Sequence, residues 1–224
     1  MIVVVVTHLA AFAIGFVVAI AIIVLAGRFL PEGNAHDAEV PVFAVPSRAI
    51  FSLGLLCFFV LVGEGAIADW SAVYLENALG ASTAVAALGF GAYSLAMAGM
   101  RFGGDALIAR LGSVLVVRTG CLVAALGLGG AMALGTVPAG IAGFAAVGLG
   151  LALAFPAALS AAGRTPGMAP GAAIGAVATA GYSGLLLGPP MIGFVSDFAG
   201  LRAGLGLVAM LCLVSAMLAG AMRR

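Results

Sequence analysis

Seven apolar runs divide the chain, and each is long enough to cross a lipid bilayer as an α-helix. A spanning helix needs about 20 predominantly apolar residues. Short charged, Gly-containing or Pro-containing breaks separate the runs, and only the break at Pro138 interrupts a stretch, 113–162, that is almost continuously apolar. Because that stretch far exceeds one span, we divide it into two helices. The predicted spans are 2–27, 49–76, 84–104, 113–136, 138–162, 171–195 and 201–222.

The composition indicates the same class. Of the 224 residues, 64% are apolar and 8% are charged, whereas soluble domains carry about 25% charged residues. A water-soluble domain of this size needs far more polar cover for its surface, so lipid must be the solvent for most of the chain. The fold class is therefore predicted to be an all-α membrane protein with seven transmembrane helices.

The types of basic and sulfur-containing residues exclude several functions. All nine basic residues are arginines, so no lysine is present for a P-loop, a Schiff base or a lysine nucleophile. A net charge of +1 gives no indication of a nucleic-acid partner. Cys57, Cys121 and Cys212 lie in apolar runs without a CxxC pair, and we predict that they are small buried hydrophobes. We expect no enzymatic activity, no cofactor and no metal site.

The arginine positions predict the orientation, because cytoplasmic loops are enriched in basic residues. With seven helices, Arg202 is alone on one side of the membrane, and eight arginines share the other: Arg28, Arg48, Arg101, Arg110, Arg118, Arg164, Arg223 and Arg224. The C-terminus is therefore predicted to be cytoplasmic and the N-terminus to lie outside. The chain divides into a single helix (1–27), a polar cytoplasmic linker (28–48) and a six-helix bundle (49–224). An odd helix count with an outward N-terminus leads us to expect that an upstream segment is missing.

A carboxyl group within the second span is the strongest functional candidate. Glu64 lies about 22 Å from Ala49 at ~1.5 Å per residue, and thus within the hydrocarbon. An ionisable side chain there by default faces the bundle interior or a water-filled cavity and marks a pathway. Glu64 is therefore a candidate for proton coupling, and the alternative is a structural Glu that pins two helices together. Asp69, near the outer boundary beside Trp70, is a second candidate, and Ser71 returns to the Glu64 face of the helix.

Glycines and charges gather where the third span is predicted to end. Residues 99–112 are expected to form a tight cytoplasmic turn, in which Asp105 pairs with Arg101 or Arg110 or lies against a helix N-terminus. Such a cluster either latches helices in one conformational state or simply fixes the topology. The motif residues are Arg101, Gly104, Asp105, Arg110 and Gly112.

A weaker version of this pattern recurs on the opposite side of the membrane. Asp197 lies 92 residues after Asp105, and it too is followed by a Gly and an Arg. Each aspartate closes the middle helix of a three-helix group, which favours two inverted three-helix repeats.

Prolines and a few polar residues complete the candidates. Pro156 lies inside the fifth span, and Gly188, Pro189 and Pro190 lie inside the sixth. Each Pro frees a backbone carbonyl and kinks its helix, so these positions are either hinges or inert kinks. The polar groups expected to line a cavity are Ser71, Tyr93, Ser94, Thr179, Tyr182 and Ser183.

These residues resemble the major facilitator superfamily (MFS). The resemblance covers nearly the whole chain and places 2–27 as the sixth helix of that family and 49–224 as its seventh to twelfth. It depends on the 99–112 motif, on Gly148-x-Gly150…Pro156…Ser160…Arg164, and on Gly181-Tyr182…Gly188-Pro189-Pro190…Gly193. The segment Glu64-Gly65…Asp69-Trp70-Ser71 is similar to a bacterial inner-membrane subgroup. The chain departs from the family at Ala106, where a basic residue often follows the aspartate.

The resemblance implies secondary active transport of a small solute across the bacterial inner membrane by alternating access, with proton coupling through Glu64. Family members have twelve helices, so this half would need a second half-transporter or self-association. Two alternatives stay open: a truncated or split-gene fragment without transport of its own, and a seven-helix receptor or channel. The short loops argue against a receptor.

Overall fold

The computed structural model describes residues 47–223, and these residues contain six helices long and apolar enough to span a membrane. The predicted first helix, 2–27, lies outside the described residues, as does nearly all of the predicted linker, 28–48. The count of seven helices is therefore a prediction, and six spans are seen. The elements are α2 (Arg48–Val73), the π-helical η1 (Tyr74–Ala78), α3 (Thr83–Leu111), α4 (Ser113–Leu134), α5 (Val137–Leu151), α6 (Ala154–Ala162), α7 (Pro170–Ala199), α8 (Leu201–Leu218) and the 3-10 turn η2 (Ala219–Arg223).

Each predicted run from 49 onward corresponds to one span. The span 137–162 is a single interrupted helix that consists of α5 and α6. The turn predicted before Pro138 is confirmed, since Pro138 lies in the first turn of α5. Proline suits that position because its missing N–H would have no helical partner there.

Two helices extend past their predicted ends. Residues 105–111 continue α3, so the tight turn predicted for 99–112 is wrong, and residues 196–199 continue α7 beyond its predicted end at residue 195. Falling hydropathy marks the exit from the membrane, and it does not end a helix whose next residues tolerate helical geometry. The helices end instead at Gly112 and Gly200, whose φ angles of 79° and 81° favour glycine.

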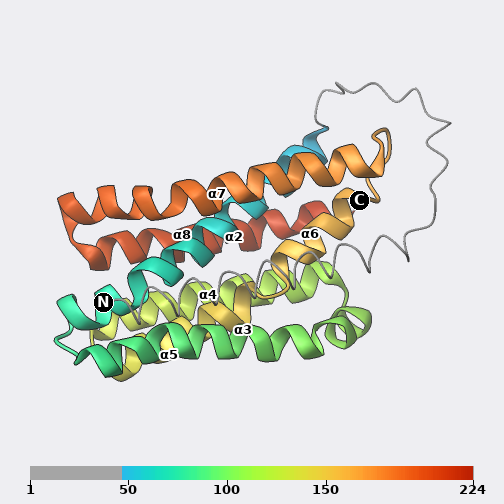
Figure 1. Cartoon of the computed structure of the whole chain (residues 1–224). Coiled ribbons are helices and arrows are strands. Elements are labelled where there is room, and N and C mark those ends of the chain that lie inside the picture. Colours follow the sequence, from blue (N-terminus) through green and yellow to red (C-terminus); the bar gives the residue numbers. More distant parts are fainter. Residues whose placement is uncertain (1–46, 224) are drawn as a thin grey trace, which may run out of the picture. The chain divides into compact units, whose positions relative to one another are not determined.

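Helix α2 and the α5–α6 span are the most buried of the six. Helix α2 packs chiefly against α7 and α8, and α5 packs against α3 and α4, while α4 also contacts α8 (Figure 1). Arg118 stabilises the contact between α4 and α8, because its Nε donates to the Ala216 carbonyl at 3.2 Å near the end of α8. Carbonyls in the last turn of a helix lack helical donors.

Glycines allow α2 and α7 to approach each other closely. A Cβ at Gly188 would come within 3.0 Å of the Cα and carbonyl oxygen of Val62, and a Cβ at Gly184 would overlap the Phe58 backbone. Small residues serve helix contacts in this way within membranes. The three cysteines are buried and free, as predicted.

Candidate functional site

Glu64 lies on α2 with its carboxyl group half-buried in the bundle. Its Oε1 is inaccessible and has no hydrogen-bond partner among residues 47–223. The carboxyl group lies within electrostatic range of Tyr93 and Arg101, both on α3. Asp69 is exposed, five residues further along α2. The structure therefore keeps the two predicted carboxylates apart and places only Glu64 beside other polar groups of the bundle.

Two further polar atoms of the same span, in α2 and η1, are buried. Ser71 and Tyr74 each have 0% exposure, and neither hydroxyl has a hydrogen-bond partner within the described part of the chain. The Tyr74 ring packs edge-on against Phe144 of α5 at a centroid distance of 6.3 Å. Unpaired buried hydroxyls are costly, so Ser71 and Tyr74 are exceptions among the buried polar groups of the described residues.

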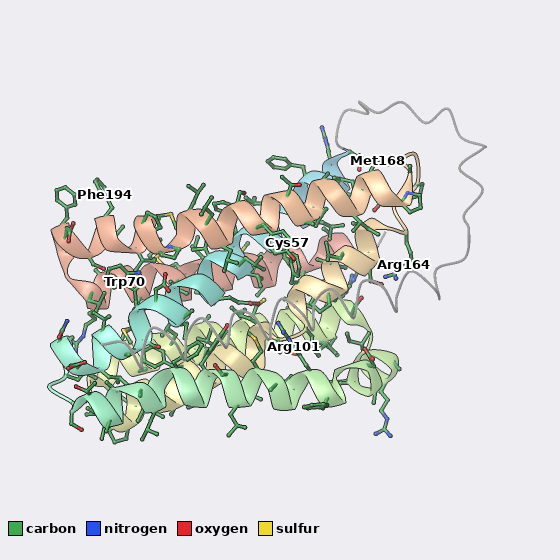
Figure 2. All side chains as sticks on the ribbon, viewed as in Figure 1. Cys57, Trp70, Arg101, Arg164, Met168 and Phe194 are labelled. Carbon is green, nitrogen blue, oxygen red and sulfur yellow. The ribbon has the colours of Figure 1, made fainter. Side chains whose placement is uncertain are left out.

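Trp70 links α2 to α7. Its indole Nε1 donates to the Pro189 carbonyl oxygen at 3.3 Å, and the ring lies beside Gly193 (Figure 2). Trp70 is half-buried and ties α2 to the proline-containing segment of α7.

Arg101 is the residue whose place the sequence analysis missed. It lies in α3, ten residues before the helix ends, and not in a loop. Its Nε donates to the carbonyl oxygen of Ala152 at 3.3 Å, where α5 gives way to α6. Figure 2 shows the side chain directed from α3 toward this part of the bundle.

A cavity of about 460 Å³ opens beside this arginine. Aromatic, aliphatic and hydroxyl groups of one face of α3 line it, which combines apolar walls with a cation. The lining residues are Tyr93, Ser94, Met97, Ala98, Arg101 and Phe102. Concave sites with apolar walls and a few polar groups are typical of small-molecule sites, so this cavity, with Glu64 nearby, is the candidate solute site.

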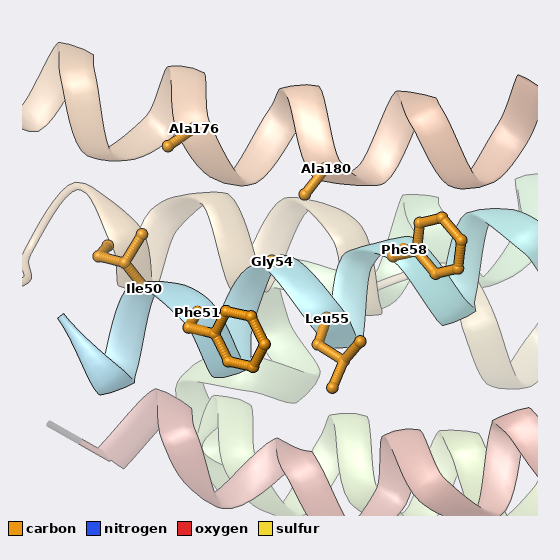
Figure 3. Close-up of a pocket in the computed structure, with 7 residues that line it drawn as sticks. All are labelled: Ile50, Phe51, Gly54, Leu55, Phe58, Ala176 and Ala180. Atoms are coloured by element: carbon orange, nitrogen blue, oxygen red, sulfur yellow. The ribbon is translucent and has the colours of Figure 1, made fainter. Parts of the chain in front are cut away.

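A second cavity, of about 270 Å³, lies between α2 and α7 (Figure 3). Every side chain that lines it is apolar, so it offers no side-chain hydrogen bond to a polar solute. Its residues are Ile50, Phe51, Gly54, Leu55, Phe58, Ala176 and Ala180.

The other motif residues are spread along the last turns of α3. Gly104 is buried against Leu153, whereas Asp105 and Arg110 are exposed. The bond from Arg101 to the Ala152 carbonyl links α3 to the α5–α6 break. The latch through Asp105 stays a prediction.

The predicted hinge residues differ in their local structure. Pro156 lies in α6, directly after a break at residues 152–153. Pro189 and Pro190 lie inside α7, which is helical throughout, and Gly188 is buried against Val62. Of these positions, only Pro156 accompanies an interruption of its span.

Taken together, six apolar spans with a buried carboxyl group and an arginine-lined cavity define a multi-pass helical membrane protein. No family model matches the chain. It is 33% identical over 208 residues to an MFS-type transporter of Yersinia pestis, a match that covers 93% of this chain and 54% of the relative. It is also 33% identical over 191 residues to a transporter of Sinorhizobium fredii, covering 85% of this chain and 51% of the relative.

A third relative is the membrane protein MosC of Rhizobium meliloti, with 29% identity over 178 residues, 80% of this chain and 44% of the relative. The predicted resemblance to the MFS is thus confirmed over about 85–93% of the chain. It spans about half the length of the curated relatives it matches.

Proposed function

We propose that the chain forms one half, the C-terminal half, of a secondary active transporter that moves a small solute by alternating access. The observation that carries this proposal is the sequence relationship to MFS-type transporters over 93% of the chain. The cavity beside Arg101 supports it, because the cavity joins apolar walls to a few polar groups.

An internal repeat supports the assignment to a transporter half. Helices α2, α3 and α4 start at residues 48, 83 and 113, and α5, α7 and α8 start at 137, 170 and 201. The offsets are 137 − 48 = 89, 170 − 83 = 87 and 201 − 113 = 88 residues. The packing of α2 against α7 and α8 corresponds, under this offset, to the packing of α5 against α3 and α4. Because each unit has three spans, the second would be inverted in the membrane.

Glu64 is proposed as the proton-coupling group. Its carboxyl group is partly buried, lacks a hydrogen-bond partner at Oε1 within residues 47–223, and lies within electrostatic range of Arg101. Intramembrane carboxyl groups of this kind mark ion pathways. Asp69 and Ser71 are proposed as further residues of the pathway, Asp69 at its exposed end and Ser71 in its buried part.

The test is solute-driven proton movement in proteoliposomes that contain a pH-sensitive dye. A panel of small polar and amphipathic solutes is added outside, and the rate of internal acidification is measured. We expect Glu64→Gln to abolish the acidification and to leave the protein folded. Glu76→Gln is the matched control, because Glu76 is exposed and its Oε1 only accepts from Thr83 at 2.9 Å. Acidification that persists in Glu64→Gln would contradict the coupling role.

The half-length match favours a second candidate, a truncated or split-gene fragment without transport activity of its own. Helices α3 and α7 are the least buried of the six spans, as expected for helices that face another half. The partner would be a second half-transporter or a second copy. Crosslinking in membranes from cells that produce only this chain separates the candidates, since a crosslinked dimer indicates self-association. A monomer without solute-driven acidification indicates the fragment.

The orientation is also part of the proposal. A multi-pass protein of the bacterial inner membrane is proposed, with its C-terminus cytoplasmic. A tag after Arg224 that resists protease in intact spheroplasts and is cleaved in inverted vesicles would support this orientation.

A further inference from the structure

The carbonyl group of Ala152 is left without a helical donor. In an α-helix the N–H of residue i donates to the carbonyl of residue i−4, and the residue four positions after Ala152 is Pro156, which has no N–H. The helix stops at Leu151 and resumes at Ala154, where the Ala157 N–H donates to the Leu153 carbonyl at 3.1 Å. Ala152 has 0% exposure, so water does not replace the missing donor.

Arg101 supplies that donor from another helix. Its Nε lies 3.3 Å from the Ala152 carbonyl oxygen, and it is the donor found on this oxygen within residues 47–223. One turn further along α3, Gly104 is buried against the Leu153 side chain, and a Cβ at Gly104 would overlap that side chain. Helix α3 therefore brings a cation and a glycine to the same break, one for the free carbonyl and the other for close approach.

The rest of the guanidinium group does not need to be buried for this contact. Arg101 is exposed overall and lines the cavity of about 460 Å³ with Ser94 and Phe102. Nε thus makes the contact with the bundle, while the exposed part of the side chain borders the cavity. The Met97 side chain, one turn before Arg101, is buried and keeps this face of α3 against the bundle.

We propose that Arg101 is a positioning residue that takes the place of the missing Pro156 N–H and fixes the angle between α5 and α6. This role goes beyond transport and does not depend on the solute or on proton coupling. Without the arginine, the break has an unpaired buried carbonyl, and the two segments lose the bond that ties them to α3. A charge-assisted hydrogen bond to a backbone carbonyl is among the stronger single contacts in a protein.

A double-mutant cycle between Arg101 and Pro156 tests this role. The thermal midpoint of the full chain in detergent is followed with a thiol-reactive fluorogenic dye, because all three native cysteines are buried and become reactive on unfolding. We expect Arg101→Met to lower the midpoint by about 3–10 °C. In the Pro156→Ala background, the substituted residue offers a backbone N–H to the Ala152 carbonyl, so Arg101→Met should lower the midpoint by less than half as much.

Two control variants make the cycle specific. Arg110→Met removes an exposed arginine of the same helix and should leave the midpoint unchanged. Arg101→Lys retains a donor and should recover at least half of the loss, which a role in general packing or net charge would not predict.

The proposal is overturned if Arg101→Met lowers the midpoint equally in both backgrounds, or if Arg110→Met has the same effect. If Arg101→Met yields no folded protein, recovery of folded Arg101→Met/Pro156→Ala protein supports the proposal. Failure of that double variant as well, while Pro156→Ala alone folds, overturns it.

Discussion

Replacing Gly188 by Ala tests whether the contact between α2 and α7 depends on backbone approach. The added Cβ would lie 3.0 Å from the Cα and the carbonyl oxygen of Val62. Both atoms belong to the backbone of α2, so no side-chain rotation relieves the contact and the helices must separate by several tenths of an ångström. Overpacking of this kind costs about 1–3 kcal/mol.

Gly175→Ala is the matched control on the same helix. Gly175 is exposed, and nothing lies within 4 Å of a Cβ built there. Both substitutions gain the helix propensity of Ala over Gly, about 0.5–1 kcal/mol, so the difference between the two variants isolates the overpacking. At about 2–4 °C per kcal/mol for a chain of this size, the Gly188 variant should unfold roughly 2–12 °C below the Gly175 variant.

The assay is the same thiol-reactive dye in detergent, read against temperature. Equal midpoints for the two variants would refute the close approach of the helices at this position. A Gly188→Ala protein that keeps its midpoint but loses solute-driven acidification would instead favour the hinge role predicted for Gly188 from the sequence.

Two further substitutions test contacts of α2. Trp70→Phe removes the donor to the Pro189 carbonyl and should lower the thermal midpoint by about 1–6 °C. The control Phe194→Leu, at an exposed aromatic residue of α7, should leave the midpoint unchanged. Equal effects of the two substitutions would contradict the role of the indole N–H. Ser71→Ala removes a buried hydroxyl that has no partner within residues 47–223 and should raise the midpoint by about 2–6 °C, and a lower midpoint would indicate that Ser71 has a partner in the folded protein. If Ser71 belongs to the transport pathway, the same variant should be more stable and less active.

The lengths of the apolar runs predicted the six described spans well, because crossing a bilayer imposes a simple requirement on helix length. A helix in lipid must satisfy its own backbone over about 20 residues, so the six runs from 49 onward each correspond to one observed span. Helix ends were less predictable. Leaving the hydrocarbon does not stop the backbone hydrogen bonds, and α3 therefore continues through Asp105 and Arg110 to Gly112.

The same error concealed the place of Arg101. Within the turn predicted for 99–112, Arg101 was one of two possible partners of Asp105, whereas the structure shows its Nε at the α5–α6 break. The place of Glu64 within an apolar span was accessible from sequence because it requires only a count of residues along one helix. The partner of Arg101 was not, because it depends on how two distant helices pack, which no local pattern records.

The two proline-containing spans show why a proline alone does not predict a hinge. Pro156 leaves the Ala152 carbonyl free, and the span breaks there with an arginine as the new donor. Pro189 leaves the Leu185 carbonyl free in the same way, yet α7 stays helical. That carbonyl oxygen faces Gly65 of α2, where an added Cβ would lie 3.1 Å away.

The neighbouring helix therefore decides the outcome of each proline. A long cationic side chain reaches a carbonyl that has turned out of the helix, and so it stabilises a broken span. In α7, the small Gly65 of the adjacent helix leaves room for a carbonyl that keeps its helical direction. The hydrogen bond from the Trp70 Nε1–H to the Pro189 carbonyl holds α2 and α7 together there. On this reasoning the α5–α6 break is held by one replaceable bond, whereas the α7 prolines are held by packing along α2. Motion within this half is then expected first at residues 152–153.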